Sequence, residues 1–309
     1  MLAIFLKTLP FFALIGLGWF AGRIRFFPQD ATAWLTKFVF YFALPAMLFR
    51  FAGSLDIRQL FDLRFVLAYL IGSLAVWAIG FCVARLRGLP TAECAMEAHT
   101  GMTGNTGFLG VPMLAVLLGE RAIGPIMLLL VIDLIFFSSL VTLMISAARQ
   151  GRLTLAFLPQ LLRGIISNPM IAAMIAGVIW SALALPLWQP LDEFLALLGA
   201  AATPGALFAI GASLAGKSAE RLGPAIWLSF AKLILHPLAV GLLALMVFRV
   251  EPFAAGVMIA ASALPVAGNV YILAQYFGVA VQRVSTAILI STGVSIITIP
   301  LVIHWITGG

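Results

Sequence analysis

Three ionisable residues stand inside long apolar runs of the chain and could carry charge chemistry. Asp133 lies in the middle of one run, and Lys232 and His236 lie four residues apart in another, so that on a helix they would share one face. If these runs cross a bilayer, each charge costs about 2.5–3.5 kcal/mol at the membrane centre. We therefore expect an Asp133–Lys232 ion pair. Its role is either to balance and couple charge during a reaction cycle or to lock two helices as a static salt bridge.

Two apolar runs are interrupted by residues that a continuous transmembrane helix does not readily carry. The first interruption lies within residues 101–112, with four glycines and a proline, and the second within residues 263–271 around Pro265. Glycine allows close approach to the backbone, and proline removes one helical donor and bends the chain. Two half-helices that meet inside a membrane present free N–H groups and positive dipole ends, which suit an anion.

These interruptions contain our candidate binding residues for a small anion. They are Gly104, Asn105, Thr106, Gly107, Pro265, Gly268 and Asn269. The alternative is a pair of kinked helices that pack tightly and bind nothing, as membrane helices commonly do. Broken helix at membrane depth persists only inside protein or beside a water-filled cavity, so two breaks at equivalent positions favour the binding site.

The composition indicates that these residues belong to a polytopic membrane protein. Of 309 residues, 63% are hydrophobic and 9% are charged, whereas a soluble domain is about 45–50% apolar and about 25% charged. A crossing needs ~20 apolar residues, and ten runs of suitable length leave only short loops. The runs are 2–22, 33–51, 64–84, 93–118, 122–147, 165–185, 194–215, 223–248, 253–278 and 283–305. This pattern excludes a secreted disulfide scaffold and a cytosolic enzyme with a peripheral anchor.

The basic residues predict the orientation in the membrane. They are scattered between the apolar runs, as membrane anchors are, and form no nucleic-acid footprint. Eleven of the 18 Lys and Arg residues fall on one side of a ten-span arrangement and six on the other, while Lys232 lies inside a run. Because the cytoplasmic side carries the excess, we expect a multi-pass protein of the cell inner (plasma) membrane. Both termini would be outside, and residues 148–164 would form a cytoplasmic loop.

An internal repeat divides the chain into two halves. Residues 44–49 match residues 203–208, and the interruption around Asn105 in the first half matches the one around Asn269 in the second. The halves would be residues 1–147 and 165–309, each with five helices. An odd number of crossings gives the halves opposite orientations, which is the inverted repeat of many secondary transporters. We therefore predict an all-α fold of ten transmembrane helices with interrupted fourth and ninth spans.

No enzyme or metal chemistry is indicated. The chain lacks an H-E-x-x-H motif, a G-x-S-x-G elbow and a Walker A loop, and its three histidines are far apart. We expect no catalytic residues, no metal, no cofactor and no ATP-driven step. The alternatives of an intramembrane enzyme and a signalling receptor are disfavoured, because the sequence shows neither a catalytic pair nor a soluble output module. Glu93, Glu97 and His99 precede the first interruption and are expected to form a solvated helix start.

The two interruptions resemble sequence blocks of the auxin efflux carrier family. Asn105-Thr106-Gly107-Phe108-Leu109-Gly110-Val111-Pro112 is similar to the family's N-T-x-x-x-G-[IVL]-P block. Ala263-Leu264-Pro265 followed by residues 272–278 is similar to its A-x-P…[FIV]-[LV]-A-x-x-[FY]-[GN] block, and Ser167-Asn168-Pro169 also fits. The resemblance covers essentially the whole chain, and the short central loop resembles prokaryotic members. The chain departs from plant carriers at Gly104, where they have proline, and at Gln275, where they often have a basic residue.

The resemblance implies an architecture and an activity. Spans 1, 2, 6 and 7 would form a scaffold and a homodimer surface, and spans 3–5 and 8–10 a mobile transport domain that moves by an elevator-type motion. The fourth and ninth spans would cross at their breaks, with Asn105 as the substrate-contacting asparagine and Pro265 as the crossover proline. Bacterial relatives handle small carboxylates such as malate and malonate, so we expect a secondary transporter of a mono- or dicarboxylate or an auxin-like acid, with H⁺ or Na⁺ as the coupling ion. The alternative is a sodium-coupled organic anion symporter resembling the bile acid transporters.

Overall fold

The computed structural model describes residues 2–54, 62–150, 167–216 and 221–308. Within these ranges every regular element is helical, and the only β-type pairing is a single antiparallel bridge between Gly104 and Val266. The predicted all-α class is therefore confirmed for the described residues. Most of the expected loop at 148–164 lies outside them, as do the basic residues Arg58, Arg152, Arg163 and Lys217.

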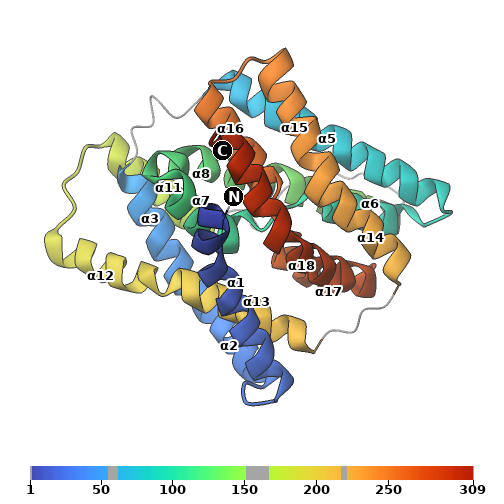
Figure 1. Ribbon diagram of the computed structural model, residues 1–309, viewed down its shortest axis with the longest axis horizontal. Coiled ribbons are helices and arrows are strands. Elements are labelled where there is room, and N and C mark those ends of the chain that lie inside the picture. The colour runs from blue at the N-terminus through green and yellow to red at the C-terminus, as the bar shows by residue number, and fades with distance from the viewer. Residues whose placement is uncertain (1, 55–61, 151–166, 217–220, 309) are drawn as a thin grey trace.

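The helices of the first half follow the five N-terminal apolar runs (Figure 1). In chain order they are α1 (Leu2–Arg23), α2 (Gln29–Phe38), η1 (Val39–Ala43), α3 (Leu44–Ser54), α5 (Leu63–Leu86), α6 (Thr91–Met102), η2 (Thr106–Gly110), α7 (Val111–Leu118), η3 (Glu120–Ala122), α8 (Ile123–Ile132), η4 (Asp133–Phe137) and α9 (Ser138–Gln150). The elements η1, η2 and η4 are single π-helical turns that continue directly into the neighbouring α-helices.

The helices of the second half follow the five C-terminal runs. They are α11 (Pro169–Ala182), α12 (Gln189–Ala200), α13 (Ala202–Ala215), α14 (Leu222–Phe230), η6 (Ala231–Leu235), α15 (His236–Leu242), η7 (Leu243–Val247), α16 (Pro252–Ser262), α17 (Gly268–Phe277) and α18 (Val281–Ile306). Acidic and amide side chains fix several helix starts, as expected for N-caps. Asn168, for example, accepts from the amide of Met170 at 3.0 Å, just ahead of Pro169.

Seven helical segments of the described chain are long and apolar enough to cross a membrane. Three further apolar helices are shorter, namely Thr106–Leu118, Pro169–Ala182 and Pro252–Ser262. Two of these three adjoin the interruptions that the sequence predicted. The helix of the fourth run stops at Met102 and restarts at Thr106, and that of the ninth run stops at Ser262 and restarts at Gly268.

Two helix pairs pack closely through glycine. The pair α1 and α13 lies side by side, and so does the pair α3 and α11 (Figure 1). A Cβ atom on Gly211 of α13 would lie 1.9 Å from the carbonyl oxygen of Ile15, and one on Gly18 of α1 would lie 2.1 Å from that of Phe208. A Cβ on Gly177 of α11 would lie 2.5 Å from the carbonyl oxygen of Phe49 on α3. Small residues thus let the two backbones of each pair approach closely.

The remaining helices form a second group. Helix α5 packs against α6 and α15, α14 packs against α18, and α16 packs against α15 and α8. Figure 1 places α2, α3, α11, α12 and α13 on one side of the view and α5, α6, α14, α15 and α17 on the other. Of the helices that flank the interruptions, α6 and α17 lie in this second group, whereas α7 packs against α1, α8 and α16 nearer the middle of the view.

Candidate functional site

The two interruptions cross and are hydrogen-bonded to each other. The amide N–H of Asn105 donates to the carbonyl oxygen of Pro265 at 2.9 Å, and the amide of Ala267 donates to the carbonyl of Thr103 at 3.1 Å. Together they form the antiparallel bridge between Gly104 and Val266. This pairing satisfies backbone groups that the broken helices leave open, which is required where no water is available.

Two helix N-termini start at this crossing. The element η2 begins at Thr106, two residues after Gly104, and α17 begins at Gly268, two residues after Val266. Gly104 and Val266 occupy equivalent places in the two segments, so the equivalent of Asn105 is Ala267. Asn269, which the sequence comparison matched with Asn105, lies two residues further along the chain. The first amides of a helix have no intrahelical partner and carry its positive dipole end.

The side chain of Asn105 is buried at the crossing. It is 4% exposed, and its oxygen atom has no hydrogen-bond partner, as is also true of the side-chain oxygen of Asn269. The backbone of Asn105 is fully engaged, because its carbonyl accepts from the amides of Leu109 and Gly110. Since a buried polar atom without a partner is costly, both side-chain oxygen atoms are available to accept a hydrogen bond from a donor.

Lys232 lies against the crossing from the side of α16. Its Nζ atom donates to the carbonyl oxygen of Ser262, the last residue of α16, and lies 2.8 Å from Nδ1 of His236. A Cβ on Gly104 would lie 3.1 Å from the same nitrogen. The ammonium group thus lies at the negative end of a half-helix, where a cation is stabilised. Two of the predicted charge-coupling residues, Lys232 and His236, are therefore in direct contact.

Asp133 has a different partner from the one expected. The hydroxyl of Tyr69 donates to its Oδ1 atom at 2.7 Å, while Oδ2 is buried without a partner. The ion pairs of the described residues do not include one between Asp133 and Lys232, so the predicted direct ion pair is wrong. The cause is geometric, because the Lys232 ammonium group is bound at the C-terminal end of α16 and the Asp133 carboxylate is bound by Tyr69 of α5.

A chain of buried polar groups connects Asp133 with the crossing. His236 Nε2 lies 2.9 Å from the hydroxyl oxygen of Ser73, and the His236 and Tyr69 rings lie 5.9 Å apart. With the lysine donating to Nδ1, the proton of His236 is assigned to Nε2, which then donates to Ser73. The sequence analysis did not identify Tyr69 and Ser73. Two polar residues four apart in the apolar run 64–84 would share one helix face, and this pattern could have indicated a buried polar site.

The start of α6 is not solvated as expected. Glu97 and His99 are 0% and 1% exposed. The Glu97 carboxylate is bound by Arg87 at 2.7 Å and by Arg283 Nε at 3.1 Å, and Arg283 also pairs with Glu93. The prediction of a solvated helix start is wrong for Glu97 and His99, because α18 brings Arg283 over this end of α6. No group of three or more residues able to hold a metal occurs in the described ranges.

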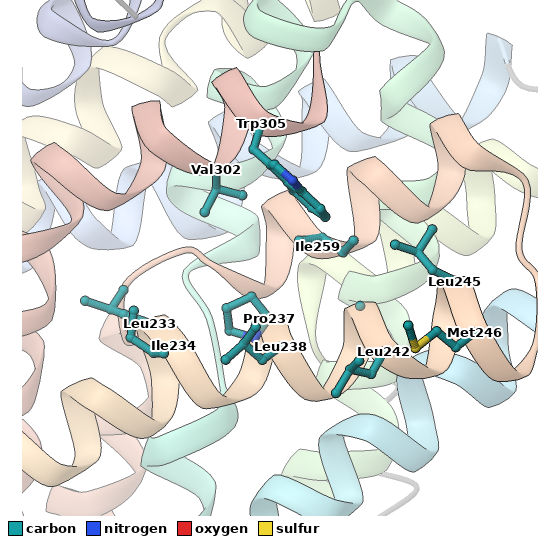
Figure 2. A pocket seen from close by; sticks show the side chains of 11 residues that line it. Leu233, Ile234, Pro237, Leu238, Leu242, Leu245, Met246, Ile259, Val302 and Trp305 are labelled. Atoms are coloured by element: carbon teal, nitrogen blue, oxygen red, sulfur yellow. The ribbon is translucent and has the colours of Figure 1, made fainter. Parts of the chain in front are cut away.

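A further feature of the second half of the chain is an apolar groove. It has a volume of about 440 Å³ and is lined by side chains of η6, α15, η7, α16 and α18, among them Pro237, Ile259 and Trp305 (Figure 2). Leu242 and Met246 on its rim are exposed. The groove contains none of the candidate binding residues, so it is separate from the crossing.

Comparison with known proteins places the chain among transporters. The family described as "Membrane transport protein" matches residues 3–303, which is essentially the whole chain. A protein of Rhizobium meliloti (strain 1021) named "Putative malonate transporter" is 31% identical over 98% of this chain and 95% of its own length. The "Uncharacterized transporter YfdV" of Escherichia coli (strain K12) is 27% identical over 96% of this chain and 95% of its own length. An "Uncharacterized transporter" of Methanothermobacter thermautotrophicus is 25% identical over 95% of each chain.

Proposed function

The chain belongs to the membrane transport protein family, which is the auxin efflux carrier family expected from its motifs, and from that premise we propose that it is a secondary active transporter of a small organic anion. One observation carries the proposal: the hydrogen-bonded crossing brings two helix N-termini to a single buried point. Carboxylates bind at such ends through amide N–H groups and the helix dipole. The cargo we propose is a mono- or dicarboxylate such as malonate, in keeping with the name of the Rhizobium relative.

The proposed architecture has ten crossings in two inverted five-helix repeats, residues 1–147 and 165–309. It is supported by the similar geometry of the two interruptions, because in each one the helix restarts two residues after the residue that forms the bridge, Gly104 or Val266. An odd number of crossings per repeat makes the halves antiparallel, which agrees with an antiparallel bridge at their centre. The proposed setting is the inner membrane with both termini outside, as the distribution of basic residues indicates.

The proposed motion is an elevator-type displacement of one helix group against the other. The scaffold consists of spans 1, 2, 6 and 7, and the close glycine contacts within α1–α13 and α3–α11 support a rigid body. The transport domain consists of spans 3–5 and 8–10 and carries the crossing. We further propose that the scaffold forms the homodimer surface, with membrane lipid around the rest.

Each candidate binding residue has a proposed role at the crossing. Gly104 and Pro265 keep the two interrupted segments close, while Thr106, Gly107 and Gly268 supply the free amides of the helix starts. The side-chain oxygen atoms of Asn105 and Asn269 lack a protein partner but are acceptors, so these two residues would offer a carboxylate their Nδ2 groups as donors. A carboxylate can accept several such donors at once.

We propose that Asp133, Lys232 and His236 balance charge and couple transport to protons. All three are buried, and Tyr69 and Ser73 extend them into one polar chain. The Lys232 ammonium already lies at the carbonyl end of α16, where a sodium ion would need oxygen ligands. This contact favours proton coupling over the sodium-coupled alternative.

Uptake into proteoliposomes tests the proposal. The purified protein is reconstituted, and uptake of radiolabelled malonate, malate, succinate and acetate is measured at several pH values with sodium or choline as the external cation. We expect saturable uptake of at least one carboxylate that depends on a pH gradient and not on sodium. Absence of carboxylate uptake by folded protein would overturn the proposed cargo, and strict sodium dependence would overturn the proposed coupling.

A further inference from the structure

Met170 lies against the first turn of the half-helix that starts at the crossing. Its terminal methyl carbon is 2.9 Å from the position that a Cβ atom on Gly107 would occupy, and Cδ1 of Leu130 is 3.5 Å from the same position. Met170 is 2% exposed. The methionine therefore fills the space that a side chain at residue 107 would otherwise take.

This space flanks the unpaired amides of η2. Its first residues are Thr106 and Gly107, and the carbonyl of Asn105 accepts only from the later amides of Leu109 and Gly110. A carboxylate oxygen bound to the early amides would lie about 2.7–3.2 Å from their nitrogen atoms. Any substituent on the cargo that projects from this side would meet the Met170 methyl group.

Met170 belongs to span 6 of the proposed scaffold, whereas the amides it covers belong to span 4 of the proposed transport domain. It is the second residue of α11, which packs against α3, and the side chain of Asn168 caps the start of that helix through the amides of Met170 and Ile171. The backbone of Met170 is therefore held firmly. Its unbranched thioether side chain can still adapt to the surface of the bound cargo.

We propose that Met170 determines the size of the cargo at the crossing. Its methyl group closes one flank of the first turn of η2, so an unsubstituted short dicarboxylate fits and a carboxylate with a bulky substituent does not. This inference rests on the proposed function for its cargo, whereas the steric role of Met170 stands on the geometry alone. Met170→Ala removes the three outer heavy atoms, and Met170→Leu retains most of the volume.

The first test measures selectivity. Uptake of malonate and of phenylmalonate is compared in the wild type, Met170→Ala, Met170→Leu and the matched control Met174→Ala, which removes the same atoms one turn further along α11. We expect the phenylmalonate-to-malonate ratio to rise about tenfold or more in Met170→Ala and to stay at the wild-type value in the other two. Equal ratios in Met170→Ala and Met174→Ala would overturn the proposal.

The second test needs no cargo. Thr106→Cys is introduced into a background in which Cys82 and Cys94 are replaced, and its labelling by a small anionic methanethiosulfonate is compared with that by fluorescein maleimide. We expect Met170→Ala, but not Met174→Ala, to raise the rate with the bulky reagent relative to the small one. An unchanged rate ratio would overturn the steric role even if transport is intact. A raised ratio in a protein that carries no carboxylate would support the steric role and count against the proposed cargo.

Discussion

Asn105 and Pro265, which lie in opposite halves of the chain, are joined by a hydrogen bond of 2.9 Å from the amide of the first to the carbonyl of the second. With the bond between Ala267 and Thr103, it turns two broken helices into one antiparallel bridge. The bridge uses only backbone groups. The side chain of Asn105 takes no part in the bridge, so its substitution should leave the crossing in place.

Asn105→Ala should weaken malonate binding with little effect on folding. A hydrogen bond to a charged group contributes about 1.5–3 kcal/mol, which corresponds to about 10- to 150-fold in affinity. Isothermal titration of purified protein gives the affinity, and thermal denaturation in detergent checks the fold. Wild-type affinity in the folded variant would remove Asn105 from the site.

Asp133→Asn should flatten the dependence of uptake on pH, because it removes the buried carboxyl group that we propose takes part in proton coupling. The groups that face Asp133 and its neighbours are Tyr69 from α5, Lys232 from η6 and His236 from α15. Tyr69→Phe keeps the carboxyl group and removes its hydrogen bond, so this variant should retain a pH dependence with an altered midpoint. A wild-type profile in Asp133→Asn would assign the titration to another group and the role of Asp133 to structure.

Gly211→Ala should destabilise the protein, whereas Gly16→Ala should not. A Cβ on Gly211 would overlap the carbonyl oxygen of Ile15, while nothing lies within 4 Å of one on Gly16. Overpacking costs about 1–3 kcal/mol, and alanine in an unhindered helix position gains about 0.5–1 kcal/mol over glycine. Thermal denaturation of the two variants measures the difference, and equal stabilities would mean that α1 and α13 are not in close contact.

Glu97→Gln should cost more stability than Glu93→Gln. The Glu97 carboxylate is fully buried between Arg87 and Arg283, whereas the Glu93 side chain is 34% exposed. Breaking a buried ion pair costs about 3–5 kcal/mol, and an exposed pair is worth about 1 kcal/mol or less. The two variants are compared by chemical denaturation in detergent. Similar small losses would indicate that water reaches Glu97.

Much of the architecture could be read from the chain because it follows from local composition. Apolar runs predicted where the helices lie, since each run must satisfy its backbone within itself. The clusters of glycine, proline and asparagine predicted both interruptions and carried the family resemblance, which the comparisons confirmed. These features depend on neighbours within one or two helical turns.

Side-chain partners depended on the tertiary structure, because they are set by how each helix is rotated and where it crosses another. The charges of Asp133 and Lys232 suggested a pair, yet α5 brings Tyr69 to the carboxylate and the end of α16 receives the ammonium. The sequence predicted a solvated Glu97, whereas in the structure Arg283 of α18 pairs with it and it is buried. The sequence alone determined that two breaks exist; the packing of the helices decided that Asn105 lies opposite Pro265 and that Met170 covers Gly107.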